Sequence, residues 1–239
     1  MKKKILIFII TYYSSYKLKE VFNLIPFKKL KKYKIKVLIS DDQSKDDTIK
    51  YAIKIQKTNK KNVELKQNFK RLNYGGNIKS CLDYAQNRNY RYAVMLHGDA
   101  QYDPRYIPLL VKKIINLECA AVHGSRMKIK KNALKGRMPI YKFIGNIFLT
   151  FIFNMIYFTN FSDCHSGYWV YDLKYVNKKI YKDLTNTLNF DNQLRINLIK
   201  KDLTINEVAI KTIYNDEKKS YQLIYAIKFL FETIFKRFS

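Results

Sequence analysis

The sequence is poor in cysteine, and the pattern of its three cysteines excludes two ways of stabilising a small domain. Cys81, Cys119 and Cys164 are odd in number, lie far apart and show no paired spacing. They therefore predict neither a disulfide framework nor a cysteine-based zinc site. This usage is typical of a protein in a reducing cytosol.

Acidic residues are also few, and this shortage gives the chain a strongly positive charge. There are 19 Asp and Glu residues against 46 Lys and Arg residues, a net charge of +27. Such an excess favours a polyanionic partner: nucleic acid, an anionic membrane face or a phosphorylated substrate. Lys, Asn, Ile and Tyr are all abundant, as an AT-rich coding sequence would produce, so we discount about half of this signal.

A signal-peptide cleavage site, internal repeats and linkers are missing too. The basic start leads into an apolar run at residues 5–10, which is short and continues into Thr11 without a small-residue cleavage site. We interpret this run as a buried first strand. The chain has 239 residues, of which 47% are hydrophobic, so it can bury a sizeable core. We expect a single domain over residues 1–239.

Short apolar runs alternate with helical patterns along the chain. The runs predict strands at residues 5–10, 35–40, 63–65, 92–96, 120–123 and 205–210. The periodic segments predict helices at residues 16–25, 48–56, 73–85, 106–117, 189–201 and 221–238. This alternation is typical of βαβ units, so we expect an α/β fold with a mainly parallel central sheet.

Two carboxylates stand directly at the end of the second predicted strand. Asp41 and Asp42 follow residues 35–40. They lie too early in the chain to cap the next helix, for which Asp46 or Asp47 is well placed. Ligands of open α/β sheets bind where strands end at their carboxyl side, so this strand end is a candidate site.

A second polar cluster follows the fourth predicted strand and contains His97, Asp99 and Gln101. If the chain stays extended there, the side chains of Asp99 and Gln101 point the same way and can hold one divalent cation through oxygen. The alternative is an acidic turn that caps the helix starting near Pro104. From this segment alone, both interpretations stay open.

A glycine pair opens the helix predicted at residues 73–85. Gly75 and Gly76 would let the backbone approach a ligand phosphate closely, and the helix N-terminus favours negative charge. The alternative is a plain turn, which such a pair indicates more often.

The second half of the chain contains two candidate membrane segments. Residues 143–162 form an uncharged stretch of twenty residues, close to the length that spans a bilayer. Its asparagines and threonines favour a buried or membrane-surface helix, with a true span as the alternative. Residues 221–238 predict an amphipathic C-terminal helix, with Lys228, Glu232 and Lys236 on one face. It either packs on the domain or lies on a membrane.

Seven short motifs follow one another along nearly the whole chain: Thr11-Tyr12-Tyr13, the acidic run from Asp41 to Thr48, Tyr74-Gly75-Gly76-Asn77, His97-Gly98-Asp99-Ala100-Gln101, Gly124-Ser125-Arg126, His165-Ser166-Gly167-Tyr168 and Phe190-Asp191-Asn192-Gln193. In this order they resemble a known family, the family 2 glycosyltransferases of GT-A (Rossmann-like) fold. Within this family the chain is similar to the dolichyl- or polyprenyl-phosphate sugar synthases.

The resemblance implies a set of substrate-binding residues. Thr11, Tyr13, Asp41 and Asp42 would line the nucleotide pocket, with a carboxylate recognising base or ribose. Further substrate contacts are expected from Gly75, Gly76, Arg126, Ser166, Gly167 and Lys218. Basic residues such as Arg126 and Lys218 could meet a second phosphate.

The resemblance also implies a metal and a base. Asp99 and Gln101, with His97 beside them, match the positions that hold Mg²⁺ or Mn²⁺ against the diphosphate. A cation there would stabilise the charge that grows on the departing nucleoside diphosphate, which makes Asp99 a catalytic position. Asp191 matches the acidic position near the acceptor and is the candidate general base.

The chain departs from the family pattern at three motif positions. Many relatives have aspartate where this chain has His97, so its metal shell has lost a charge or gained a nitrogen. Trp169 stands where Arg is frequent, and Gln193 stands where Glu is frequent. These changes predict altered acceptor recognition or reduced activity. The tandem membrane-spanning helices that follow the catalytic domain in many relatives are not found here.

The resemblance therefore implies an inverting glycosyltransferase that moves a sugar from a nucleotide sugar to a polyprenyl phosphate. Residues 1–125 would bind the nucleotide sugar, and residues 126–239 would face the acceptor. We expect a cytoplasmic protein that attaches peripherally to the anionic inner face of the cell membrane. The alternatives are a glycan hydroxyl acceptor in surface polysaccharide synthesis and a catalytically silent relative. Nucleic acid is disfavoured as a partner, because the lysines are scattered and the acidic clusters oppose a polyanion.

Overall fold

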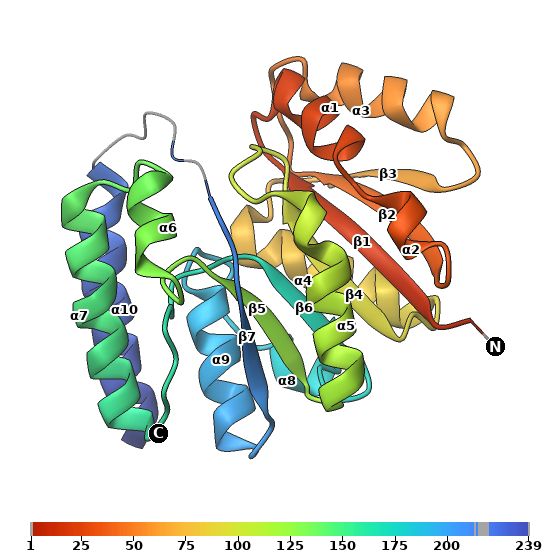
Figure 1. The fold of residues 1–239 in the computed structure, drawn as a ribbon. Helices are drawn as coiled ribbons and strands as arrows, with labels where there is room; N and C mark the ends of the chain where they lie inside the picture. Colours follow the sequence, from red (N-terminus) through yellow and green to blue (C-terminus); the bar gives the residue numbers. More distant parts are fainter. Residues whose placement is uncertain (1, 213, 215–219, 239) are drawn as a thin grey trace.

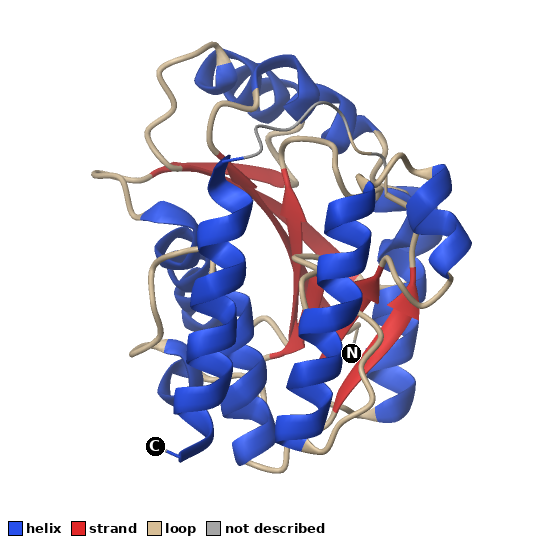
Figure 2. Ribbon diagram, turned by 90° about the vertical axis from the view of Figure 1, so that its left-hand side faces the viewer, coloured by secondary structure: helices blue, strands red, loops and turns tan. Residues whose placement is uncertain are grey.

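A seven-stranded sheet with helices on both faces forms the centre of the protein (Figures 1 and 2). The computed structural model describes residues 2–212, 214 and 220–238. The strands are β1 (Lys4–Thr11), β2 (Lys34–Asp41), β3 (Val63–Gln67), β4 (Tyr92–His97), β5 (Ala121–Ser125), β6 (Trp169–Asp172) and β7 (Ile205–Ala209). The helices are α1 (Ser15–Asn23), α2 (Phe27–Leu30), α3 (Thr48–Thr58), α4 (Asn73–Asn87), the 3₁₀ turn η1 (Pro104–Tyr106), α5 (Ile107–Leu117), α6 (Lys130–Lys135), α7 (Ile140–Tyr157), α8 (Lys178–Tyr181), α9 (Phe190–Lys200) and α10 (Ser220–Phe238).

The predicted α/β fold with a mainly parallel sheet is confirmed. The strand order is β3-β2-β1-β4-β6-β5-β7, and every pairing is parallel except the two that β6 makes. The sequence patterns predicted six of these strands and missed β6. This short antiparallel strand joins β3, β2, β1 and β4 on one side to β5 and β7 on the other.

The first strand shows why its sequence is a continuous apolar run. Ile5, Ile7 and Ile9 pack into the cluster that α1, α3 and α5 cover, whereas Leu6 and Phe8 face α4, α8 and α9 on the other side. Because helices cover both faces, no position of this strand needs a polar side chain.

The parallel register brings the carboxyl ends of the central strands to one edge. Thr11 of β1 lies opposite Asp41 of β2, and Ile10 lies opposite His97 of β4. The polar residues that follow these strands therefore meet, as expected for a ligand site of an open α/β sheet.

A pair of helices, α7 and α10, lies beside the second half of the sheet (Figure 1). Phe153 and Tyr157 of α7 pack with Phe229 of α10, and the Tyr157 hydroxyl donates to the Thr233 carbonyl at 3.0 Å. Both helices were predicted. Among the described residues α7 alone is long and apolar enough to cross a membrane, and 22% of it is buried.

Candidate active site

The carboxylates at the end of β2 are buried and held by hydrogen bonds. Asp41 accepts from the Thr11 hydroxyl at 3.1 Å and from the Ser44 backbone N–H at 2.9 Å. Asp42 accepts from Asn68 Nδ2 at 3.0 Å and from the Leu72 N–H at 2.8 Å. The structure therefore brings Thr11, Asp41 and Asp42 together in one fixed arrangement.

An exposed aromatic pair lies next to these carboxylates. The rings of Tyr12 and Tyr13 meet edge to face at 4.5 Å and are 41% and 50% exposed. The guanidinium of Arg71 lies 4.2 Å from the Tyr12 ring. Such flat cationic and aromatic groups can stack on a nucleobase. Of these three residues, only Tyr13 was predicted as a substrate contact. Tyr12 belongs to the same motif, and Arg71 precedes the Tyr74 motif by three positions, so their places in the sequence were the available signal.

The chain bends between Asp99 and Gln101 instead of staying extended. Ala100 adopts φ 63°, and the Asp99 carboxylate accepts from the Gln101 N–H at 3.0 Å. The helical segment at Pro104 is capped by Asp103, which accepts from the Arg105 N–H at 2.9 Å. Asp99 is therefore not needed as the helix cap and lies exposed at the end of β4.

The residues at this turn fit a divalent cation that takes most of its ligands from elsewhere. Within the described residues no three His, Cys, Asp or Glu side chains come together as a metal cage. Asp99 offers an exposed carboxylate, and Mg²⁺ is commonly bound by one or two carboxylates together with substrate phosphates and water. Nε2 of His97 lies 3.3 Å from the Tyr74 hydroxyl, so a metal would have to use the other ring nitrogen.

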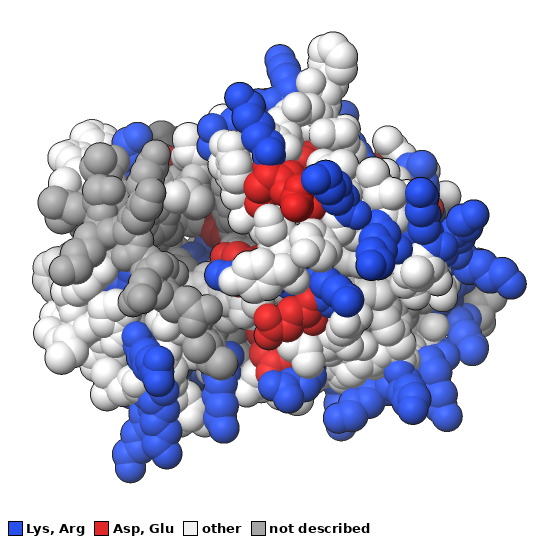
Figure 3. Space-filling view, turned by 90° about the horizontal axis from the view of Figure 1, so that it is seen from above, with Lys and Arg blue, Asp and Glu red and all other residues white. Residues whose placement is uncertain are grey.

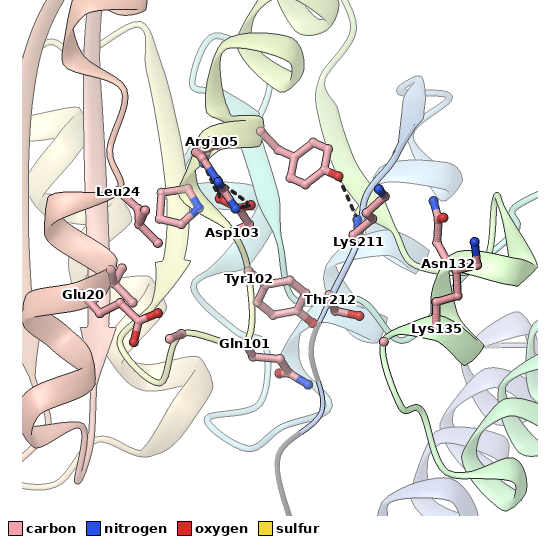
Figure 4. A pocket seen from close by; sticks show the side chains of 15 residues that line it. Glu20, Leu24, Gln101, Tyr102, Asp103, Arg105, Asn132, Lys135, Lys211 and Thr212 are labelled. Carbon is pink, nitrogen blue, oxygen red and sulfur yellow. Dashed lines mark hydrogen bonds and ion pairs between the residues drawn. The ribbon is translucent and has the colours of Figure 1, made fainter.

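A cleft of about 550 Å³ adjoins this turn (Figure 4). Gln101 and Tyr102 form its floor between α1 and the segment around Thr212. Lys135 and Lys211 line the side opposite α1, so the cleft is cationic there. Seen from above, Asp and Glu side chains gather in the middle of the molecule, and Lys and Arg side chains surround them (Figure 3).

Asp191 lies in the first turn of α9 and is 7% exposed. Its Oδ2 accepts a hydrogen bond from the Tyr74 hydroxyl at 2.7 Å, while Oδ1 is buried without a partner among the described residues. Burial raises the pKa of Asp191 to about 7, although the Tyr74 hydrogen bond and the positive charge of Arg195 act in the opposite direction. A carboxyl with a pKa near neutral is suited to proton transfer.

The four predicted glycine and serine positions are all buried. A Cβ on Gly75 would lie 2.4 Å from the Thr185 carbonyl, so this glycine lets α4 pack against the segment before α9. Gly76 meets Asn186 of the same segment. Gly167 lies against His97, and the Ser166 hydroxyl is buried without a hydrogen-bond partner among the described residues. Substrate binding by these four stays a prediction.

Arg126 is buried in an ion pair. Its Nε and Nη2 donate to Asp163 at 2.7 and 2.8 Å, and Nη1 donates to the Tyr214 hydroxyl at 2.9 Å. Burial acts to lower the pKa of Arg126, but the negative charge of Asp163 raises it well above its ordinary value. The guanidinium can reach a phosphate only through its remaining N–H groups. Lys218, the other predicted cationic contact, lies outside the described residues.

Trp169 and Gln193, two residues that depart from the family pattern, each make specific contacts in the structure. Trp169 is fully buried in β6, with the Arg195 guanidinium 5.0 Å from its ring. Gln193 accepts from the Thr185 N–H and donates to Glu232 of α10 at 3.0 Å. These contacts place Trp169 in the core and use Gln193 to join α9 to α10.

Comparison with solved structures defines the class. Glucosyl-3-phosphoglycerate synthase of Mycobacterium tuberculosis, in complex with Mn²⁺, UDP and glucosyl-3-phosphoglycerate, matches with a TM-score of 0.66 at 12% identity over 98% of this chain and 80% of that chain. A mannosyltransferase of Pyrobaculum calidifontis, in complex with GDP-Man and Mn²⁺, matches with a TM-score of 0.63 at 12% identity over 94% and 60%. The fold is that of GT-A glycosyltransferases.

Sequence comparison then gives the family. The family described as "Glycosyl transferase family 2" matches residues 7–179, and the chain belongs to this family. It is a nucleotide-sugar-dependent glycosyltransferase. An uncharacterized protein of Methanocaldococcus jannaschii is 30% identical over 81% of this chain and 83% of the relative. A UDP-N-acetylglucosamine–dolichyl-phosphate N-acetylglucosaminyltransferase of Methanococcus voltae is 29% identical over 75% of each chain.

Proposed function

We propose that this enzyme transfers a sugar from a nucleoside-diphosphate sugar to a polyprenyl phosphate at the cytosolic face of the membrane. The observation that carries this proposal is the apolar outer surface of α7 and α10, which lies on the same half of the molecule as Asp191. A lipid-linked acceptor needs a surface of this kind beside the reacting groups.

This outer surface is made of large apolar side chains that the protein leaves exposed. On α7 they are Ile140, Ile144, Phe148, Phe151 and Met155, and on α10 they are Ile227, Phe231, Ile234 and Phe235. Contiguous exposed apolar side chains of this number mark an interaction surface. Their place on two adjacent helices supports insertion of one helix face into the headgroup and acyl boundary of a bilayer.

The inner side of α10 connects this surface to the candidate base. Glu232 accepts from Gln193, and the Thr233 hydroxyl accepts from Asn192 at 3.4 Å, so α10 contacts both residues that follow Asp191. An acceptor phosphate held at the membrane surface would reach Asp191 past this helix. Lys228 and Arg237 are exposed on α10 and would meet anionic lipid headgroups.

The nucleotide sugar is assigned to residues 1–125 and the acceptor to residues 126–239. Thr11, Tyr13, Asp41 and Asp42 would bind the nucleotide, and Asp99 with Gln101 would hold Mg²⁺ or Mn²⁺ against the diphosphate. When bound, the cation would stabilise the negative charge of the leaving group. Asp99 supplies an exposed carboxylate at the end of β4. Asp41 and Asp42 are buried at the end of β2, where hydrogen bonds hold them in place.

A second candidate acceptor is a glycan hydroxyl, and Asp191 is the observation that favours it. A sugar hydroxyl must lose a proton during attack, and a carboxyl with a pKa of about 7 can take it. A phosphate acceptor is already ionised near neutral pH and needs no base. The two acceptors therefore predict different costs for Asp191→Asn: about a hundredfold or more in turnover with a hydroxyl, and much less with a phosphate.

The test is a product assay over a panel of nucleotide sugars. Polyprenyl phosphate and soluble glycans serve as acceptors, with divalent metal and with chelator. We expect glycosyl polyprenyl phosphate, formed only with metal, and a small effect of Asp191→Asn. Transfer to a glycan alone, with a base-like pH dependence that Asp191→Asn removes, would overturn the choice of acceptor.

A further inference from the structure

Three polar side chains from separate elements form a continuous chain across the site. His97 comes from the end of β4, Tyr74 from the first turn of α4, and Asp191 from the first turn of α9. His97 Nε2 lies 3.3 Å from the Tyr74 hydroxyl, which lies 2.7 Å from Asp191 Oδ2. The tyrosine thus connects the metal-side strand end to the candidate base.

The direction of these hydrogen bonds follows from the proton count. A tyrosine hydroxyl has one hydrogen, and the short contact to a carboxylate oxygen uses it. In the contact with His97 the tyrosine oxygen must then accept, so His97 Nε2 carries a hydrogen.

Tight packing fixes the tyrosine in this position. A Cβ on Gly167 would lie 2.9 Å from both the Tyr74 hydroxyl and Cε1 of His97, so the pair fits only against glycine. The rings of Tyr74 and His97 meet edge to face at 5.6 Å. The hydroxyl of Tyr74 therefore has little freedom to leave Asp191.

We propose that Tyr74 is a positioning residue for Asp191: it holds Oδ2 and leaves Oδ1 as the oxygen that meets the acceptor. This inference rests on the proposed function, because it assigns the acceptor to the side of Asp191. It explains why Oδ1 is buried and lacks a partner among the described residues. An acceptor hydroxyl would donate to this atom when bound, whereas an ionised phosphate oxygen would accept from it while the carboxyl is protonated.

Several groups around Asp191 influence its pKa, and Tyr74 is the one whose substitution tests the proposal. The positive charge of Arg195 on α9 acts to lower the pKa of Asp191. The charge of Asp191 in turn acts to raise the pKa values of Tyr171 on β6 and Tyr225 on α10. Among the described residues Tyr74 is the group that hydrogen-bonds the Asp191 side chain, and a donor of this kind favours the ionised form. Tyr74→Phe should therefore raise the pKa of Asp191 while the ring keeps its packing.

The experiment measures this titration directly. The full chain is labelled with ¹³C at the aspartate carboxyls, and the Asp191 resonance is identified by its loss in Asp191→Asn. We expect a midpoint near pH 7 in the wild type and a midpoint about one pH unit higher in Tyr74→Phe. Tyr84→Phe is the matched control: Tyr84 lies on the same helix and donates to Glu64, so its loss should leave the Asp191 midpoint unchanged.

An unchanged midpoint in Tyr74→Phe would overturn the proposal, as would an equal rise in Tyr84→Phe. If Tyr74→Phe does not fold, Gly167→Ala tests the same contact by displacing the hydroxyl, and the midpoint should again rise. The titration needs no turnover. A wild type without transferase activity would thus refute the proposed function, while the Tyr74 assignment would still be decided by the midpoints.

Discussion

Burial of one carboxyl group at Asp191 couples the chemistry of the site to stability. Its native pKa of about 7 lies above the ordinary value of 3.8. Between about pH 4 and pH 7 the unfolded chain therefore loses this proton while the native state retains it. The contribution of Asp191 to the free energy of unfolding falls across this window and stays low above pH 7.

Asp191→Asn removes this ionisation and should stabilise the protein at high pH. We expect the variant to exceed the wild type in free energy of unfolding by more at pH 8 than at pH 5. The difference between the two pH values should be about 3 kcal/mol, because about two of the pH units over which Asp191 is shifted lie between pH 5 and pH 7. Urea unfolding at both pH values measures it. Equal differences at pH 5 and pH 8 would show that Asp191 ionises normally.

Asp99 makes a different prediction, because it is exposed and contributes little to packing. Asp99→Asn should lower turnover about a hundredfold or more by removing the charged ligand of the cation, with an unchanged melting temperature. Asp183→Asn, at a carboxylate that is also exposed, is the control and should keep wild-type rates. Retained activity in Asp99→Asn would remove this residue from the metal site.

At the scale of elements, the sequence predicted the parts whose patterns are local. The buried run of β1 and the acidic ends of β2 and β4 are visible in a single segment. β6 was missed because four residues, Trp169–Asp172, are too short for a periodic signal, and its pairing with β4 and β5 comes from distant segments. The contact of Tyr74 with Asp191 spans 117 positions and has no local signature either.

The packing of α9 against α10 also depends on residues far apart in the sequence, Gln193 and Glu232. Exchanging the amide and the carboxylate between these two positions tests this contact. Gln193 Nε2 now donates to Glu232 Oε1 at 3.0 Å. Gln193→Glu would replace this donor by a carboxylate, so that two carboxylates would face each other at about this distance. We expect a melting temperature lower by a few degrees, since like charges at this distance repel. Adding Glu232→Gln restores one amide and one carboxylate and should recover most of the loss. No recovery would mean that α10 does not dock through this pair.

At the scale of the whole molecule, two features stand out: a large positive net charge and a large exposed apolar surface. The net charge is +27, and on the face drawn in Figure 3 Lys and Arg side chains flank a group of Asp and Glu side chains. The adjacent helices α7 and α10 expose large apolar side chains on the half that we propose faces the acceptor. Nucleic acid would have to approach the acidic groups of the site, whereas an anionic membrane can meet the apolar face and its flanking lysines together. The positive charge and the exposed apolar side chains together favour the proposal that the α7 and α10 side of the molecule faces a membrane.

This side predicts how the protein binds vesicles. Binding to anionic vesicles should weaken as salt rises, because exposed charges are screened.

The double variant Phe231→Ser with Phe235→Ser should bind at least tenfold more weakly, since each ring contributes about 2 kcal/mol when buried in the interface. Leu117→Ser changes a similarly exposed apolar residue of α5 and should bind like wild type. Co-sedimentation with anionic and neutral vesicles measures these differences. Binding to both kinds of vesicle that resists salt and carbonate would mean that α7 spans the bilayer, and an equal loss in Leu117→Ser would place the binding surface elsewhere.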